Sequence, residues 1–132
     1  MIEIKNILVK LNIKIEHFSL DNNSNDPIGS LIRFVYEWIE IDILATKYKF
    51  QELAISNAKQ IKISNGETIN IISLNDLIIF KIYANSLKDL WDADALIKIN
   101  IDYITKDDIF YIRNILTQLW KVDLFDKLIN YE

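Results

Sequence analysis

The hydrophobic residues of the first third of the chain change from a helical to a strand-like spacing. Over residues 2–12 they recur at intervals of three and four, which predicts an amphipathic helix. Over residues 13–20 they alternate with polar residues, which predicts a strand. Residues 21–29 contain the only proline and one of the two glycines, so we expect a loop there.

Four further strands are predicted from short alternating runs. The runs at residues 30–38 and 39–45 follow each other closely, so we expect them to pair as a tight antiparallel unit. The runs at residues 60–64 and 67–72 flank an Asn-Gly pair. This dipeptide favours the positive φ angles of a type I′ turn, which predicts a β-hairpin.

Helical patterns dominate the second half of the chain. Ser73 with Asp76, and Thr105 with Asp108, have the spacing of a capping box, with Asp replacing the usual Glu. We therefore expect one helix to begin at each hydroxyl residue. The predicted helices of the chain beyond residue 45 span residues 49–58, 73–84, 87–97, 105–120 and 122–130.

The order of these elements predicts an α/β (α+β) fold. We expect a small mixed β-sheet with helices on one side or at one end, followed by a helical tail. A length of 132 residues suits one domain, with a sheet-containing part at 1–72 and a helical part at 73–132. The core of the tail is expected to contain the aromatic residues Phe110, Tyr111, Trp120 and Phe125.

Composition excludes several kinds of site. The chain has no cysteine, which rules out disulfides, thiolate zinc sites and a cysteine nucleophile. This fits a reducing interior, so we expect a cytoplasmic protein. Charged residues interrupt the apolar N-terminal stretch, which argues against a signal peptide or a membrane span. A net charge of -4 argues against nonspecific nucleic-acid binding by the whole domain, while a local basic patch stays open.

Two acids in the predicted strand at 39–45 form the first candidate site. Glu40 and Asp42 are two residues apart and therefore share one face of the strand. Carboxylate oxygens suit Mg²⁺, so the pair is a candidate metal site. The alternative interpretation is an edge strand whose polar face meets solvent. Arg33 is expected to pair with Glu37 or Glu40.

Lys81 is the second candidate, because it lies in an otherwise apolar helix. One interpretation is a lysine that reaches a polyphosphate, and the alternative is a side chain whose stem packs on the core while its ammonium reaches water. Asp89 and Asp92 follow at a spacing of three and share a helical face. They are candidates to hold Lys81 and a metal, or are solvated acids that favour a helix N-terminus.

Taken together, these segments resemble the later part of a nucleotidyltransferase domain. The similarity lies in the strand IEIDIL, the helix and hairpin after it, and the phrase IISLNDLIIFKIYANSLKDLWDADAL. It covers roughly residues 2–100. The group comprises the minimal nucleotidyltransferases and the AbiEii-type toxins of bacterial toxin–antitoxin systems.

The resemblance implies a site and a reaction. Such domains bind Mg²⁺ through three acids on a polymerase-like sheet and transfer a nucleotide from a nucleoside triphosphate to a hydroxyl on protein, RNA or a small molecule. Asp42 corresponds to the third acid and Lys81 to a helical lysine, which makes both candidate catalytic residues. Asp89 and Asp92 correspond to a later acidic motif, and with Lys81 they are the candidate nucleotide-binding residues. The candidate metal ligands are Asp42 and Glu40.

The chain departs from the family pattern both upstream of Asp42 and before Lys88-Asp89. The family has a Gly-Ser turn followed by Asp-x-Asp, whereas Gly29-Ser30 is not followed by such a pair. The arginine that precedes Lys-Asp in the family is Ser86 or Leu87 here. We therefore expect a truncated or degenerate nucleotidyltransferase-like domain that is weak or inactive alone.

Two alternatives stay open from the sequence. The first is a non-catalytic binding or regulatory module of a toxin–antitoxin-like pair, in which an exposed sheet edge pairs with a protein partner or a second copy. The second is a stand-alone magnesium-dependent transferase that uses Glu40 and Asp42 as a shifted acidic pair.

Overall fold

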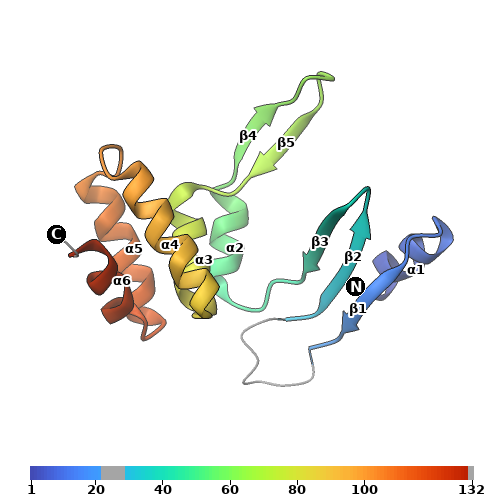
Figure 1. Cartoon of the computed structure of the whole chain (residues 1–132), viewed down its shortest axis with the longest axis horizontal. Helices are drawn as coiled ribbons and strands as arrows, with labels where there is room; N and C mark the ends of the chain where they lie inside the picture. The colour runs from blue at the N-terminus through green and yellow to red at the C-terminus, as the bar shows by residue number, and fades with distance from the viewer. Residues whose placement is uncertain (22–28, 131–132) are drawn as a thin grey trace. The chain divides into compact units, whose positions relative to one another are not determined.

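The computed structural model describes residues 1–21 and 29–130, which form two compact units, Met1–Glu52 and Leu53–Glu132 (Figure 1). Most of the predicted loop at 21–29 lies outside the described residues. The N-terminal unit contains α1 (Ile2–Lys10), β1 (Ile15–Ser19), β2 (Leu31–Tyr36) and β3 (Ile39–Leu44). The unit boundary falls inside α2 (Lys49–Ser56). The C-terminal unit continues with β4 (Lys59–Lys62), β5 (Thr68–Ile71), α3 (Leu74–Ala84), α4 (Leu87–Asn100), α5 (Lys106–Gln118) and α6 (Val122–Ile129).

The N-terminal unit is an antiparallel sheet of order β1-β2-β3 with α1 against it. Leu8 of α1 and Ile32 and Phe34 of the central strand are buried together. Apolar residues of β1 and β3 surround this cluster, including Ile15 and Ile43. The alternation seen in the sequence therefore puts one face of the sheet into a small core, while the other face is more exposed and mixes charged with apolar side chains.

Strands β2 and β3 are joined by the tightest kind of hairpin turn. Tyr36 pairs directly with Ile39, so only Glu37 and Trp38 form the turn. Their φ angles are 46° and 75°, the left-handed values of a type I′ turn. Trp38 is 97% exposed, so its side chain gains almost no burial there. The predicted tight antiparallel unit is confirmed.

The predicted hairpin of β4 and β5 is confirmed, but the prediction of a type I′ turn is wrong. Gly66 has a φ of 86°, and of the Asn65-Gly66 pair it alone has a positive φ. The N–H of Gly66 donates to the carbonyl of Ile63, and the N–H of Ile63 donates to the carbonyl of Glu67, each at 2.9 Å. This is a three-residue loop with glycine at the left-handed position. The hairpin projects from the helices of its unit (Figure 1).

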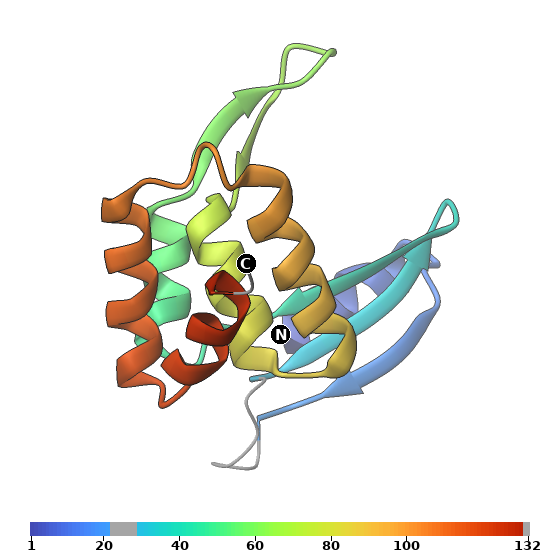
Figure 2. The ribbon, with the colours of Figure 1, turned by 60° about the vertical axis from the view of Figure 1, so that its left-hand side comes forward.

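Helix α3 is the centre of the C-terminal unit, where it packs against α4 and α5, and both of these contact α6 (Figure 2). The helix is apolar on nearly all sides, as expected for a central helix. Ser73 and Thr105 accept the predicted capping hydrogen bonds from the backbone N–H groups of Asp76 and Asp108. The buried apolar residues of the four helices are Ile78, Ile79, Ile82, Ala93, Ile97, Ile112, Ile115, Leu116 and Phe125.

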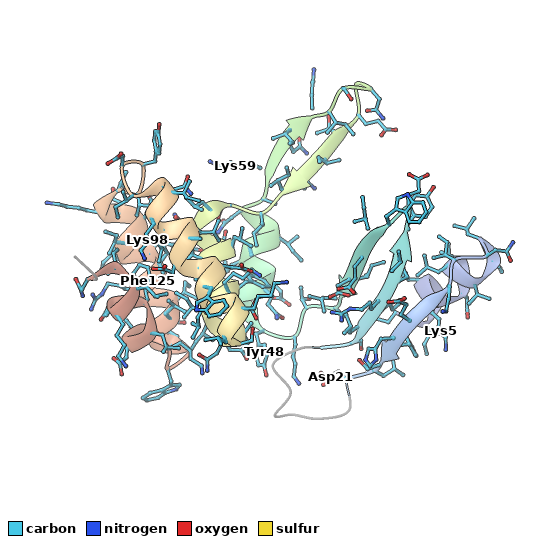
Figure 3. The ribbon with its side chains drawn as sticks, in the orientation of Figure 1. Lys5, Asp21, Tyr48, Lys59, Lys98 and Phe125 are labelled. Atoms are coloured by element: carbon cyan, nitrogen blue, oxygen red, sulfur yellow. The ribbon has the colours of Figure 1, made fainter. Side chains whose placement is uncertain are left out.

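The aromatic residues of the tail divide between core and surface. Phe125 is buried among the helices, as predicted (Figure 3). Phe110 is 74% exposed and Trp120 is also exposed, so placing them in the core was wrong. The buried positions of α5 are Ile112, Ile115 and Leu116, and at 100° per residue Phe110 faces away from them.

The expected mixture of helices and strands is confirmed, whereas the expected single mixed sheet is wrong. In the described part of the chain, both sheets are antiparallel and separate. The chain forms hairpins between sequential strands, while parallel neighbours would need long crossover connections. None of the helices in residues 1–21 and 29–130 is both long enough and apolar enough to cross a bilayer.

Candidate functional site

Lys81, Asp89 and Asp92 form one ion-pair cluster in the C-terminal unit. The ammonium of Lys81 donates to Oδ1 of Asp89 at 2.9 Å and to Oδ2 of Asp92 at 2.8 Å. All three side chains are partly buried. The structure thus brings together the three residues predicted as nucleotide-binding. The two ion pairs also explain how an apolar helix accommodates a lysine, because the ammonium is neutralised by carboxylates of the next helix.

The turn between α3 and α4 positions this cluster. Asn85 ends α3 in the left-handed conformation with φ of 56°, and Ser86 accepts the capping hydrogen bond from the N–H of Asp89. Lys81 therefore lies in the last turn of α3, and Asp89 lies in the first turn of α4. Both charges oppose the partial charge of the helix end beside them, which stabilises the corner.

Hydrogen bonding stabilises the charged forms of the cluster. The carboxylates of Asp92 and Asp89 raise the pKa of Lys81 above its ordinary value. The hydroxyl of Ser86, assisted by Lys81, lowers the pKa of the Asp89 carboxyl. The cluster carries two negative charges and one positive charge, so it holds a net charge of −1 at neutral pH.

A cavity of about 310 Å³ opens beside the cluster. One polar patch, formed by Lys81 and Asp92, lies in a wall that is otherwise aliphatic. The cavity is lined by Leu77, Lys81, Asp92, Ala95, Leu96 and Ile99.

The predicted acids of β3 lie in the N-terminal unit and are engaged by an arginine. Asp42 is the register partner of Arg33, whose guanidinium donates to both carboxylate oxygens at 2.7 Å. Glu40 lies 3.6 Å from the same guanidinium. Of the two partners expected for Arg33, which were Glu37 and Glu40, the structure therefore shows an ion pair with Glu40. The hydrogen bond from Arg33 lowers the pKa of Asp42, and Asp42 raises that of Arg33.

In both sets of acids, one carboxylate is already fully engaged. Both oxygens of Asp42 accept from Arg33, and the oxygens of Asp89 accept from Lys81 and Ser86. Mg²⁺ is commonly held by one or two carboxylates together with substrate phosphates, so a metal at either set would have to displace one of these donors or rely on the second acid. Residues 1–21 and 29–130 contain no group of three or more acidic, histidine or cysteine side chains able to hold a metal. Magnesium binding stays a prediction.

A second polar centre, which the sequence did not reveal, surrounds Asp76. This carboxylate is only 2% exposed. Its Oδ1 accepts from the hydroxyl of Tyr111 at 2.8 Å, and its Oδ2 accepts from the hydroxyl of Ser73 at 2.6 Å. Asn57 donates to the hydroxyl of Tyr111 at 3.1 Å. Burial and this carboxylate raise the pKa of Tyr111 to about 12.

The Asp76 network borders a cavity of about 500 Å³ in the same unit. The ends of α3 and α5 meet there, since Asn75 donates to Asp108. The sequence signal for Asp76 was its capping spacing alone, and nothing in the sequence links it to Tyr111. Polar side chains around the cavity include Asn57, Asn75, Asp76, Asp107, Asp108 and Tyr111.

Comparison of the chain with models of known protein families gives no match, and comparison with curated protein sequences gives none either.

Proposed function

We propose that the chain is a nucleotidyltransferase-like domain that binds a nucleoside triphosphate beside Lys81 and does not transfer nucleotides efficiently alone. One observation carries the proposal. Three residues that the motif resemblance singled out meet in one ion-pair cluster, and two of them, Lys81 and Asp92, line a cavity. The ancestral reaction would transfer a nucleotide from the triphosphate to a hydroxyl.

The charge of the cluster supports a role for Mg²⁺ in binding. With a net charge of −1, Asp89, Asp92 and Lys81 repel a bare polyphosphate. A triphosphate that carries Mg²⁺ presents a cation to the two carboxylates, and the aliphatic wall beside them suits a base or sugar. When bound, the ion supplies charge neutralisation between phosphate and carboxylate.

The pairing of Asp42 with Arg33 supports weak or absent catalysis. A carboxylate whose two oxygens both accept from a guanidinium is poorly placed to hold the ions that activate a hydroxyl. A stand-alone transferase that uses Glu40 and Asp42 would have to break this pair first.

Calorimetric titration of the purified chain with ATP, GTP, CTP and UTP, with and without Mg²⁺, tests the proposal. We expect magnesium-dependent binding of at least one nucleotide and its loss in Lys81→Ala. Lys98→Ala is the matched control, because Lys98 of α4 also forms an ion pair, with Asp94 at 2.8 Å, but does not line the cavity.

Two results would overturn the proposal. One is the absence of binding of all four nucleotides to the unaltered chain. The other is equal binding by Lys81→Ala and Lys98→Ala, which would place any nucleotide elsewhere. Thermal unfolding of both variants separates a lost site from a lost fold.

The alternative function is a non-catalytic module that pairs through a sheet edge. The observation in its favour is that β1 and β3 are the edge strands of the N-terminal sheet. A Pro substitution in β1 at Phe18 would block edge pairing there, so complex formation that survives it would exclude β1 and leave β3 as the pairing edge.

A further inference from the structure

The hydrogen-bond donors around the cavity beside Asp76 are mostly engaged within its own wall. The hydroxyl of Tyr111 donates to Asp76, and the side-chain amide of Asn75 donates to Asp108. The side-chain amide of Asn57 donates to the hydroxyl of Tyr111. The carbonyl oxygens of these two amides accept from no group in the part of the chain that the structure describes, so acceptors are left over. A ligand of this cavity is therefore expected to be rich in donors.

The charge of the wall is negative. The carboxylates of Asp76, Asp107 and Asp108 line the cavity together with one ammonium, that of Lys59 at the first position of β4 (Figure 3). Three negative charges and one positive charge leave a net charge of −2 at neutral pH. Asp107 is exposed, and its carboxylate has no hydrogen bond or ion pair with any of residues 1–21 and 29–130. Such a wall repels an anion such as a nucleotide and attracts a cation.

The burial of Asp76 gives an independent reason to expect a cation. This carboxylate is 2% exposed, and its donors among the described residues are the uncharged side chains of Tyr111, Ser73 and Asn57. A buried carboxylate is costly unless a positive charge pairs with it. A cation in the cavity would supply that positive charge.

The shape and lining of the cavity favour an organic cation over a metal ion. The described residues contain no group of three acidic or histidine side chains able to hold a metal. The cavity has a volume of about 500 Å³, which is enough for a small organic molecule. Leu74 and Ile104 form an apolar part of its wall, where an aliphatic chain can pack.

We propose that this cavity binds an alkyl diamine. The two ammonium groups match the net charge of −2 and offer donors without acceptors, and the chain between them packs against Leu74 and Ile104. No residue lines both this cavity and the one beside Lys81. The diamine site is therefore separate from the proposed nucleotide site and does not depend on it.

An NMR titration with putrescine, a butane chain with an ammonium at each end, tests the proposal. Butanediol is the matched ligand control, because it has the same chain without the charges. We expect the side-chain amide signals of Asn57 and Asn75 to shift with putrescine and to stay in place with butanediol. The dissociation constant is expected to be on the order of a millimolar, so a titration to about 10 mM approaches saturation.

A pair of charge-removing variants tests the position of the site. Asp107→Asn should weaken putrescine binding at least about threefold, because it removes one of the wall's carboxylates. Asp123→Asn is the matched control, since Asp123 is also exposed in the first turn of a helix, α6, but lies outside the cavity. It should bind putrescine like the unaltered chain, as should Lys81→Ala.

Three results would overturn the proposal. The first is the absence of shifts at Asn57 and Asn75 with putrescine in the unaltered chain. The second is equal shifts with butanediol, which would show that charge is not recognised. The third is an equal effect of Asp107→Asn and Asp123→Asn, which would reduce the binding to attraction by the net charge of the whole chain. Thermal unfolding of both variants separates a lost site from a lost fold.

Discussion

The hydroxyl of Tyr111 donates to Oδ1 of Asp76 at 2.8 Å, although the two residues are 35 positions apart in the chain. The bond joins the first turn of α3 to α5. Asn57, which follows α2, donates to the same hydroxyl and completes the link. Three segments of the C-terminal unit are therefore held together at one buried carboxylate.

Replacement of Tyr111 by Phe should destabilise the C-terminal unit. It removes the donor to a buried carboxylate and leaves an acceptor unsatisfied, which costs about 1–3 kcal/mol in free energy of unfolding. Tyr103→Phe is the control, since Tyr103 lines the same cavity but is exposed. Urea unfolding followed by circular dichroism measures both. Equal midpoints for the two variants would contradict a structural role for the Tyr111–Asp76 bond.

The contribution of Tyr111 to stability should decline at high pH. Its pKa is raised to about 12 in the folded chain by burial and by Asp76, against about 10 when unfolded. The unfolded state therefore loses its proton first, so the contribution is complete below pH about 10 and is lost as the pH rises toward about 12. Urea unfolding at a series of pH values should show the unaltered chain approaching Tyr111→Phe. A constant difference across that range would refute the raised pKa.

The turn between β2 and β3 should be improved by residues that tolerate a positive φ. Glu37 and Trp38 both adopt left-handed angles, which cost residues other than glycine about 1 kcal/mol or more each. The double variant Glu37→Asn with Trp38→Gly should raise the thermal midpoint of the N-terminal unit, because the exposed tryptophan loses little burial.

The converse substitution is Gly66→Ala, which is expected to destabilise the β4–β5 hairpin because Gly66 has a φ of 86°. Backbone amide shifts in NMR spectra report each hairpin separately. A neutral Gly66→Ala together with a destabilising Trp38→Gly would show that backbone strain does not govern these turns.

Local chemistry made much of the C-terminal unit predictable. The spacing of Ser73 with Asp76 and of Thr105 with Asp108 marks helix starts, because the capping partners lie within one turn. Lys81 meets Asp89 across a single tight corner, so the spacing of the sequence was informative there too. The Asp76–Tyr111 bond was not predictable, because it depends on how α3 and α5 pack, and no local pattern encodes that.

Other errors have a local cause that the sequence contained. Counting α5 at 100° per residue from Ile112 puts Phe110 on the exposed side, so periodicity outweighs residue type in that helix. The type of the β4–β5 turn depended on loop length, since one additional residue leaves only Gly66 in the left-handed region. The division of the strands into two separate sheets depends on tertiary packing, so the sequences of the individual strands do not predict it.

Because the β4–β5 hairpin is exposed, we expect it to open locally and to tolerate insertions. None of the residues of β4 or β5 is buried, and an isolated two-stranded ribbon is only marginally stable in water. Its amide protons should therefore exchange with solvent through local opening while those of α3 remain protected. Proteases should therefore cut the C-terminal unit first at the tip of this hairpin. Residues inserted at Asn65 should leave the helices folded, so the chain can lengthen at this ribbon without loss of its core.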